Sequence, residues 1–331
     1  MRIGLKWRVL DRFLLSADCC PRTGRSRIHS RSRRPHAPPA SSPRRIPPCS
    51  SISAYAPLYK TNLTTSLYNK PAPSSDPTKQ SIFLIGKERV PSAEARSIEL
   101  FMQEMDETET ERAVIMGRKA DEYGSVDNDE IDELARAYPG RFIPFAGVNP
   151  NLPGQVEEIE RVAAMGFRGV GIDAGWLRRP LYHDDPVFDP IYAKCQELGM
   201  IVSLTSSFML GPDLSYSEPC AIQRVAMKYP NMKIVVPHGC WPHVHNALAV
   251  AIRCPNVYLM PDCYIYIDGF ALSDEYIKAA NTYLKYRILY ASSYPVRSLS
   301  QCLRGWKSRG FTDEALQNTL YDNAARLLGE K

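Results

Sequence analysis

Several short apolar runs in this sequence end in polar side chains, and the sharpest case is His238. It directly follows the run Lys233–Pro237, and Gly239 lets the chain turn at that point. Asp173 and Asp262 each stand at the end of another such run. Imidazole is the most common metal ligand and a natural acid/base near neutral pH, while a carboxylate can bind metal, act as a general base or fix the histidine tautomer. We therefore expect these three residues to be catalytic, with His238 also a metal ligand.

The same three residues have structural alternatives: a histidine hydrogen-bonded in the core, or aspartates that cap the helices after the strands. The other histidines outside the N-terminal region are weaker candidates. His183 lies in a loop before a helix, where we expect it to face solvent. His243 and His245 stand at the start of a helix, where their rings point to different sides.

Hydroxyl and guanidinium groups stand at further strand ends. Thr205 closes the run Ile201–Thr205, and Ser293 comes two residues after the run Arg287–Ala291. We expect both hydroxyls to contact substrate or bound water. Arg297 lies just beyond and can grip a substrate carboxylate, because a guanidinium forks onto it with two hydrogen bonds; the alternative is a surface charge.

The elements that must position these side chains are short β-branched runs that alternate with helix-length amphipathic stretches, the pattern of repeated βα units and a parallel sheet. The runs are almost continuously apolar, as in strands that are buried on both faces. The expected strands are Ala113–Met116, Phe142–Val148, Gly169–Asp173, Ile201–Thr205, Lys233–Pro237, Val257–Met260 and Arg287–Ala291. The expected helices are Ser92–Asp106, Asp129–Ala137, Gln155–Met165, Pro190–Leu198, Ile222–Lys228, Asp274–Leu284 and Thr312–Leu328.

Strands that are each followed by a helix predict an α/β fold of the (β/α)8 TIM-barrel type, in which the first strand is unclear or missing. A doubly wound open sheet is the alternative, but no glycine-rich phosphate loop follows any of the strands. In a barrel the carboxyl ends of all the strands meet at one rim. That rim would gather His238 beside Asp173 and Asp262.

Length and charge exclude several classes of protein. The chain has 331 residues, of which 44% are hydrophobic and 23% charged, as in ordinary soluble globular proteins. Residues 1–50 hold twelve Lys and Arg against two Asp, so they carry a net charge of +10, while the other residues carry −5. The mildly acidic body argues against a folded surface that binds nucleic acid. No apolar run approaches the roughly 18 residues that span a bilayer.

Residues 1–80 differ in composition from the rest. The segment 19–80 is rich in Pro, Ser and Arg and cannot bury enough surface to offset chain entropy, so we predict a disordered leader over 1–80 and a barrel over 81–331. The first fourteen residues can form a basic amphipathic helix, and together with the arginine-rich stretch behind them they look like a mitochondrial transit peptide. An untargeted tail, a misassigned start of the coding sequence and a basic nucleic-acid arm are the alternatives. Nine cysteines, an odd number without C-x-x-C spacing, favour a reducing compartment and hence the cytoplasm, with mitochondria as the alternative.

Eight blocks in a fixed order carry a resemblance to a known family. They are MDETETERAVIMG, AYPGRFIPFAGVNP, GFRGVGID, DPVFDPIYAKCQELGMIV, KYPNMKIVVPHG, CPNVYLM, RILYASSYP and NAARLLG. Over residues 92–331 the chain closely resembles the amidohydrolase-related, metal-dependent TIM-barrel hydrolases, a family that also holds aminocarboxymuconate-semialdehyde decarboxylase and several aromatic-acid decarboxylases. The resemblance implies a divalent metal, usually zinc, that activates water for hydrolysis or holds a substrate carboxylate during non-oxidative decarboxylation.

The metal ligands that the resemblance implies are matched only in part. They are a His-x-His after the first strand, a histidine after the fifth, sometimes one after the sixth, and an aspartate after the eighth; the sixth-strand position is His238. The fifth-strand position holds Ser203 or Thr205, the eighth holds Ser293, and no His-x-His precedes residue 92. Hydroxyls are poor zinc ligands, and a serine cannot take a proton from bound water as an aspartate does. Either the leader has replaced the true first strand, or the usual metal site has been abandoned.

These observations leave three functions open. The preferred one is an amidohydrolase-like enzyme that hydrolyses a small carboxylate-bearing or cyclic substrate with water activated by a divalent metal, expected to be zinc. The alternatives are a non-oxidative decarboxylase of a small aromatic or unsaturated acid, and a catalytically lapsed barrel that acts as a binding protein. We expect a small molecule as the partner, no nucleic acid or membrane, and pairing into a homodimer.

Overall fold

Seven parallel strands form the central sheet, in the order β1-β2-β5-β6-β7-β8-β9. The structure is a computed structural model that describes residues 90–121, 124–267 and 269–331, together with the backbone of residues 50–55. The strands are β1 (Ser50–Tyr55), β2 (Arg112–Met116), β5 (Phe142–Gly147), β6 (Gly169–Ile172), β7 (Ile201–Leu204), β8 (Ile234–Pro237) and β9 (Val257–Met260). Beyond β2, the two-residue strands β3 (Arg118–Lys119) and β4 (Ser125–Val126) form a separate antiparallel pair.

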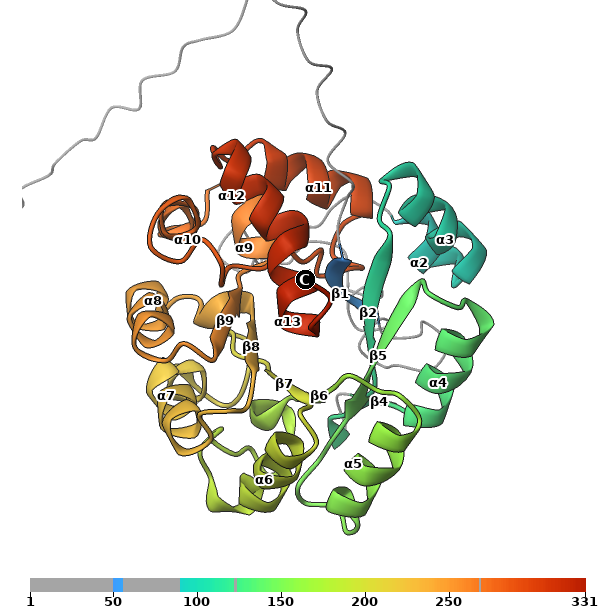
Figure 1. The fold of residues 1–331 in the computed structure, drawn as a ribbon, viewed down its shortest axis with the longest axis vertical. Helices are drawn as coiled ribbons and strands as arrows, with labels where there is room; N and C mark the ends of the chain where they lie inside the picture. The colour runs from blue at the N-terminus through green and yellow to red at the C-terminus, as the bar shows by residue number, and fades with distance from the viewer. Residues whose placement is uncertain (1–49, 56–89, 122–123, 268) are drawn as a thin grey trace, which may run out of the picture. The chain divides into compact units, whose positions relative to one another are not determined.

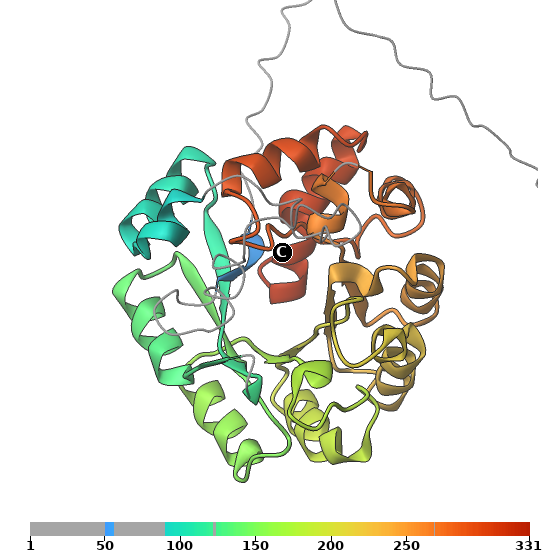
Figure 2. The same cartoon turned by 180° about the vertical axis from the view of Figure 1, so that it is seen from behind.

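The sheet curls around one axis, and the helices cover its outer face (Figure 1 and Figure 2). All the described residues belong to one compact unit, Arg45–Lys331. The helices are α2 (Pro91–Ala95), α3 (Ile98–Glu107), α4 (Asn128–Ala137), α5 (Gln155–Ala164), α6 (Asp189–Glu197), α7 (Pro219–Lys228), α8 (Val244–Arg253), α9 (Cys263–Tyr266), α10 (Ser273–Asn281), α11 (Leu299–Lys307), α12 (Asp313–Gln317) and α13 (Asn323–Leu328). This is the (β/α)8 TIM-barrel fold that the alternation of strands and helices predicts. None of these helices has the length and apolar character that crossing a bilayer requires.

Along β2 and β5 to β9, successive residues alternate between two apolar layers, one against the helices and one inside the barrel. Gly169 and Gly171 of β6 belong to the inner face, where larger side chains take their space. A Cβ on Gly169 would lie 2.5 Å from the ring of Phe145, and one on Gly171 would lie 2.4 Å from the terminal methyl of Met116. The inner cluster consists of Val114, Ile143, Phe145, Ile201, Val235, Met260, Leu289, Ala291, Ala324, Leu327 and Leu328.

Helix α13 closes the amino-terminal end of the barrel. It supplies Ala324, Leu327 and Leu328 to the inner cluster. Arg168, which precedes β6, donates to the Leu328 carbonyl, and Lys233, which precedes β8, donates to the Leu327 carbonyl at 2.7 Å. Figure 1 shows α13 near the centre of the ring of strands. The opposite end of the barrel, where the strands finish, is left for the side chains with chemistry.

The predicted strands agree with the observed ones except for the last. Arg287–Ala291 is not a strand in its own right; it joins β9 through a single parallel bridge between Leu259 and Ile288. The Leu259 N–H donates to the Arg287 carbonyl and the Leu289 N–H to the Leu259 carbonyl, both at 2.9 Å. Strand β1 pairs with β2 and falls inside the predicted leader, 1–80, whose other residues lie outside the described ones.

Two predicted helices are divided in the structure. Ser92–Asp106 breaks at Arg96, whose φ of +50° cannot continue a helix, and Ser97 caps the second part by accepting the Leu100 N–H at 3.2 Å. Thr312 caps α12 as the sequence suggests, but a π-helical turn, Asn318–Asp322, separates α12 from α13. Helices α9 and α11 were not among the predicted elements, and α8 was expected only as a helix that starts near His243, without an end.

Candidate active site

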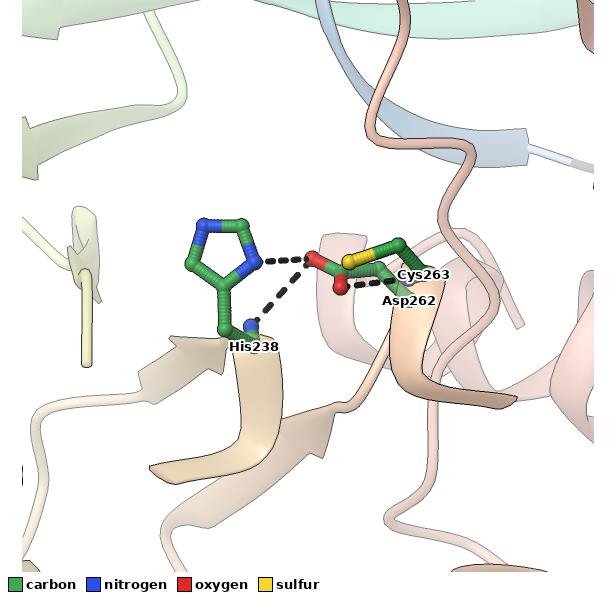
Figure 3. Close-up of side chains that lie close together, drawn as sticks. All are labelled: His238, Asp262 and Cys263. Atoms are coloured by element: carbon green, nitrogen blue, oxygen red, sulfur yellow. Dashed lines mark hydrogen bonds and ion pairs between the residues drawn. The ribbon is translucent and has the colours of Figure 1, made fainter. Parts of the chain in front are cut away.

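His238 and Asp262 form a close pair at the carboxyl ends of β8 and β9 (Figure 3). His238 Nδ1 lies 2.8 Å from Asp262 Oδ2, and the His238 backbone N–H donates to the same oxygen at 3.3 Å. The other carboxylate oxygen, Oδ1, accepts the Cys263 backbone N–H at 2.5 Å, so Asp262 also caps α9. The Asp262 side chain is 2% exposed and that of His238 21%, so a buried carboxylate supports an imidazole that reaches solvent. The structure thus brings these two predicted residues together.

The two groups stabilise each other's charged forms. Burial would lower the pKa of His238, but the attraction of Asp262 outweighs it and holds the pKa above its ordinary value; Asp173 adds to this rise and Arg118 opposes it. Burial would raise the pKa of Asp262, but the imidazole keeps it below its ordinary value. Because an ionised Asp262 holds the hydrogen on Nδ1, the Nε2 lone pair on the far side of the ring is left for chemistry. The pair can therefore take up or deliver a proton at Nε2 near neutral pH.

The backbone at these strand ends is held in an unusual conformation. His238, Asp262 and Ser293 have φ values of +64°, +36° and +47°. Residues other than glycine rarely adopt positive φ; each such position costs on the order of 1–3 kcal/mol, and they concentrate at functional sites. The Ser293 hydroxyl lies close enough to Asp262 to help lower the pKa of that carboxyl. Ser293 therefore lies beside Asp262, and its contact with substrate or bound water stays a prediction.

A cluster of aromatic rings borders the imidazole. The Tyr264 ring meets the His238 ring edge-on, with centroids 6.2 Å apart, and stacks on Trp241 at 5.1 Å. Phe208 and Phe270 pack edge-on against Trp241 at 5.2 and 5.1 Å. Trp241, Phe208 and Phe270 are only partly buried. These rings give the site an apolar wall suited to the hydrocarbon part of a small molecule.

Asp173 is paired with Arg118, a residue that the sequence analysis did not select. Asp173 Oδ2 lies 3.0 Å from Arg118 Nε, and the Arg118 guanidinium lies 5.1 Å from the ring centroid of Trp176. Asp173 caps no helix through its side chain. It acts on His238 through its charge, so the predicted group of three is a contacting pair beside a second ion pair. The available signal was spacing: Arg118 comes two residues after the inward-facing Met116, hence at the same rim.

The other two predicted contact residues lie in different surroundings. Thr205 stands one position beyond β7 and is 7% exposed. Arg297 places its guanidinium over the Tyr266 ring, 5.7 Å from the centroid, and its backbone carbonyl accepts a weak bond from the Cys302 thiol at 3.8 Å. Arg297 is thus engaged with an aromatic face rather than with His238 or Asp262.

The expectation that His183 faces solvent is wrong. Its side chain is buried, with the residue 2% exposed, and its Nε2 bonds to the Thr205 carbonyl at 3.0 Å. Nδ1 has no hydrogen-bond partner among the described residues, and burial lowers the pKa of the imidazole to about 4. The weak ranking of the next two histidines fits their surroundings: His243 Nδ1 lies 3.4 Å from Glu218 Oε1, and His245 is exposed on α8.

The donor atoms available for a metal do not fit the expected zinc centre. Within residues 90–121, 124–267 and 269–331, one group gathers three donors, His238, Asp262 and Cys263, whose ligand atoms lie within 4.8 Å of one another. Both Asp262 oxygens are already engaged, by His238 and by the Cys263 N–H. Burial and the neighbouring carboxylate hold the pKa of the Cys263 thiol well above its ordinary value, whereas zinc binds the thiolate. One free imidazole nitrogen remains, and that does not make a zinc site.

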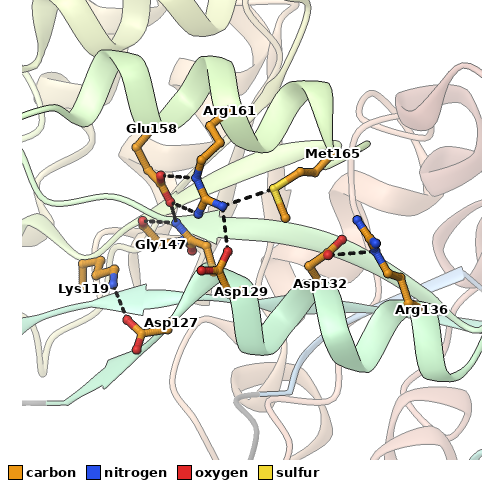
Figure 4. Close-up of polar contacts among 10 residues, drawn as sticks. Lys119, Asp127, Asp129, Asp132, Arg136, Gly147, Glu158, Arg161 and Met165 are labelled. Atoms are coloured by element: carbon orange, nitrogen blue, oxygen red, sulfur yellow. Dashed lines mark hydrogen bonds and ion pairs between the residues drawn. The ribbon is translucent and has the colours of Figure 1, made fainter.

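A cavity of about 550 Å³ lies elsewhere on the barrel, between α4 and α5 (Figure 4). Its two cations are each paired with carboxylates of the lining. Arg161 bonds to Glu158 and to Asp129, each at 2.7 Å, and Lys119 bonds to Asp127 at 2.7 Å. The lining holds no histidine or cysteine, and both of its cations are held by carboxylates, so this cavity does not compete with the rim as the candidate active site.

Comparison with known proteins assigns this chain to a family. The amidohydrolase family model matches residues 77–329, so the chain belongs to the amidohydrolase family. No curated protein matches the chain in sequence.

Several solved structures are similar to this chain. An uncharacterised TIM-barrel protein from Bordetella bronchiseptica, Bb4693, is 28% identical, with a TM-score of 0.70 over 85% of this chain and 97% of its own. A dihydroxybenzoic acid decarboxylase from Polaromonas sp. JS666, with bound manganese and 2-nitroresorcinol, is 17% identical, with a TM-score of 0.55 over 74% and 92%. A Pseudomonas putida protein assigned as a 2-pyrone-4,6-dicarboxylic acid hydrolase is 16% identical, with a TM-score of 0.57 over 71% and 88%. The last two show the shared fold alone.

Proposed function

We propose that this chain is a hydrolase of the amidohydrolase family that opens a small carboxylate-bearing or cyclic substrate, with His238 as the acid/base and Asp262 as the residue that orients it. The observation that supports this is the pair itself. A buried, ionised carboxylate lies 2.8 Å from Nδ1 and favours the hydrogen there, while Nε2 of the partly exposed ring lies on the side away from Asp262 (Figure 3). Because the described donors do not fit a zinc centre, no step of the proposal runs through a metal.

The reaction follows from the protonation states of the pair. His238 Nε2 takes a proton from a water molecule as the water oxygen attacks the carbonyl carbon of an ester or amide. The bond from that carbon to the ring oxygen or nitrogen then breaks, and Nε2 returns the proton to the leaving atom, so the net change is the addition of one water. Asp262 stays ionised and stabilises the imidazolium that forms between the two steps. Thr205 and Ser293 are proposed to bind the substrate or the attacking water.

A specific observation supports decarboxylation as the second candidate. The pKa of His238 is raised, so an imidazolium is available near neutral pH to protonate the carbon that loses CO2. Both reactions occur in the names of the structural relatives, one of which is a decarboxylase and the other assigned as a hydrolase. We rank hydrolysis first because the polar rim and partly exposed imidazole admit water to the reacting atoms.

We also propose a cytoplasmic location and a small-molecule ligand. The cysteines of the described region are free, as in proteins of a reducing compartment, although Cys220 is exposed rather than buried. Pairing into a homodimer stays a prediction of the sequence.

The pH dependence of activity separates the two reactions. Small lactones, cyclic amides and unsaturated carboxylic acids are incubated with the full chain, and ring-opened acid and CO2 are measured from pH 5 to 9. A base-catalysed hydrolase loses kcat/KM as the pH falls through the raised pKa of His238. A decarboxylase that uses the imidazolium loses kcat/KM as the pH rises through it. In Asp262→Asn the midpoint moves to lower pH, because the main cause of the raised pKa is gone.

Substitution tests the residue assignment. His238→Gln is expected to lower kcat/KM by about 10²–10⁴, the usual contribution of a positioned acid/base. His245→Gln, which changes an exposed histidine of α8, is the matched control and should leave kcat/KM unchanged. Activity that survives in His238→Gln would contradict the proposal, and tight binding without turnover of any compound would instead identify a lapsed barrel.

A further inference from the structure

The rim holds an arginine with a buried donor that no group in the described part of the chain accepts from. Arg118 Nη1 is buried and makes no hydrogen bond within the described part of the chain. The side chain as a whole is 18% exposed. A buried guanidinium N–H without an acceptor is costly, and a ligand that supplies the acceptor recovers that cost.

Two contacts fix the direction of this guanidinium. Asp173 Oδ2 holds Nε at 3.0 Å, and the indole of Trp176 lies under the guanidinium plane, with a centroid distance of 5.1 Å. A guanidinium that is already oriented loses little side-chain freedom when it binds a further group. Arg118 lies just past the carboxyl end of β2 and its partner Asp173 just past that of β6, while His238 follows β8, so the free donor and the acid/base share one rim.

The geometry points to Arg118 as the residue that binds a carboxylate group of the ligand, through Nη1 at the rim beside His238. The inference deepens the proposed function and rests on it for the chemistry, but not for the binding itself. The Arg118–Asp173 pair has no net charge, so selectivity comes from directed, charge-assisted hydrogen bonds rather than from long-range attraction. A neutral amide of the same shape accepts weaker bonds and should bind less well.

This assignment moves the carboxylate contact away from Arg297. The Arg297 guanidinium lies over Tyr266, while the charges that shift the pKa of His238 are those of Asp262, Asp173 and Arg118. Arg118 is therefore the guanidinium whose charge reaches the imidazole. If Arg118 binds the carboxylate, Arg118→Met weakens the binding of a carboxylate ligand and Arg297→Met does not. If Arg297 binds it, the reverse holds.

The experiment measures the binding of benzoate and of its neutral counterpart benzamide to the full chain by calorimetry at pH 7. Benzoate is expected to bind at least about tenfold more tightly than benzamide. Arg118→Met should abolish that preference by weakening benzoate about tenfold or more, while benzamide binding stays the same. Arg297→Met and Arg136→Met, the second an exposed arginine that pairs with Asp132 one helical turn away, should leave both affinities unchanged.

Arg118→Lys keeps the positive charge but loses the paired N–H donors of the guanidinium. This variant tests the inference if Arg118→Met fails to fold. It is expected to weaken benzoate by about fivefold or more with an unchanged melting temperature. Equal binding of benzoate and benzamide by the unmodified chain overturns the inference, as does a loss of benzoate affinity in Arg297→Met but not in the Arg118 variants. Because these are equilibrium measurements, failure of the hydrolase proposal would show in the His238 kinetics and leave the benzoate result intact.

Discussion

The buried His183 allows a stability measurement whose size follows from the structure. The imidazole is 2% exposed and has a pKa of about 4, against an ordinary value of 6.5. At a pH between these two values the unfolded chain binds a proton that the folded chain does not. The free energy of unfolding therefore decreases as the pH falls. From pH 7 to pH 5 this one residue should remove about 2 kcal/mol from the free energy of unfolding.

The comparison of two variants isolates that contribution. In His183→Gln the side-chain amide can still donate to the Thr205 carbonyl but does not titrate. Urea unfolding at pH 7, 6 and 5 should therefore show a loss of stability that is about 2 kcal/mol smaller in His183→Gln than in the unmodified chain. His245→Gln, at an exposed site, should follow the unmodified chain. His238 titrates in the opposite sense, since its raised pKa adds stability at low pH, but it is present in all three proteins and cancels.

The refuting result is simple to state. If His183→Gln loses as much stability between pH 7 and pH 5 as the unmodified chain does, the imidazole is not held neutral by burial. The reasoning about His183 would then be wrong even though its position in the fold is right.

Two further predictions concern the barrel interior and the metal. Phe145→Ala should lower the free energy of unfolding by about 3–5 kcal/mol, measured in urea, because the ring is 1% exposed within the inner cluster; a loss below about 1 kcal/mol would mean that the interior is loosely packed. Purified protein should hold well under one equivalent of zinc by mass spectrometry, and dialysis against a chelator should leave its activity unchanged; stoichiometric zinc would show that the donors of His238, Asp262 and Cys263 rearrange around an ion.

Most of the sheet could be predicted because strands buried on both faces leave a strong local pattern. Runs such as Ile234–Pro237 and Val257–Met260 are apolar throughout, and both were found within a residue of their observed ends. The segment Arg287–Ala291 has the same composition but makes only one bridge, to Leu259. Composition predicts that a segment is buried and extended, but the number of its ladder bonds depends on partners far away in the sequence.

The site was partly predictable for a related reason. His238 and Asp262 each follow a strand, and the meeting of strand ends at one rim is a rule of the fold. His183 was misjudged because its burial depends on the Thr205 carbonyl, 22 positions away, and not on its own loop sequence. Arg118 was not predicted, although its spacing from Met116 places it on the inner face of the barrel. Pairing between rim residues, such as Arg118 with Asp173, was not visible in the sequence at all.

The closure of the barrel by α13 has a consequence for how the chain can be cut. Arg112 at the start of β2 bonds to Glu330 just after α13, two residues that lie 218 positions apart. A fragment that stops short of α13 exposes the apolar side chains of the inner cluster at the amino-terminal end of the barrel. Such a fragment should therefore aggregate instead of folding as a half-domain. Circular permutation, by contrast, can retain α13 at this end of the barrel, provided that the new termini lie in a surface loop and α13 stays joined to its neighbours in the chain.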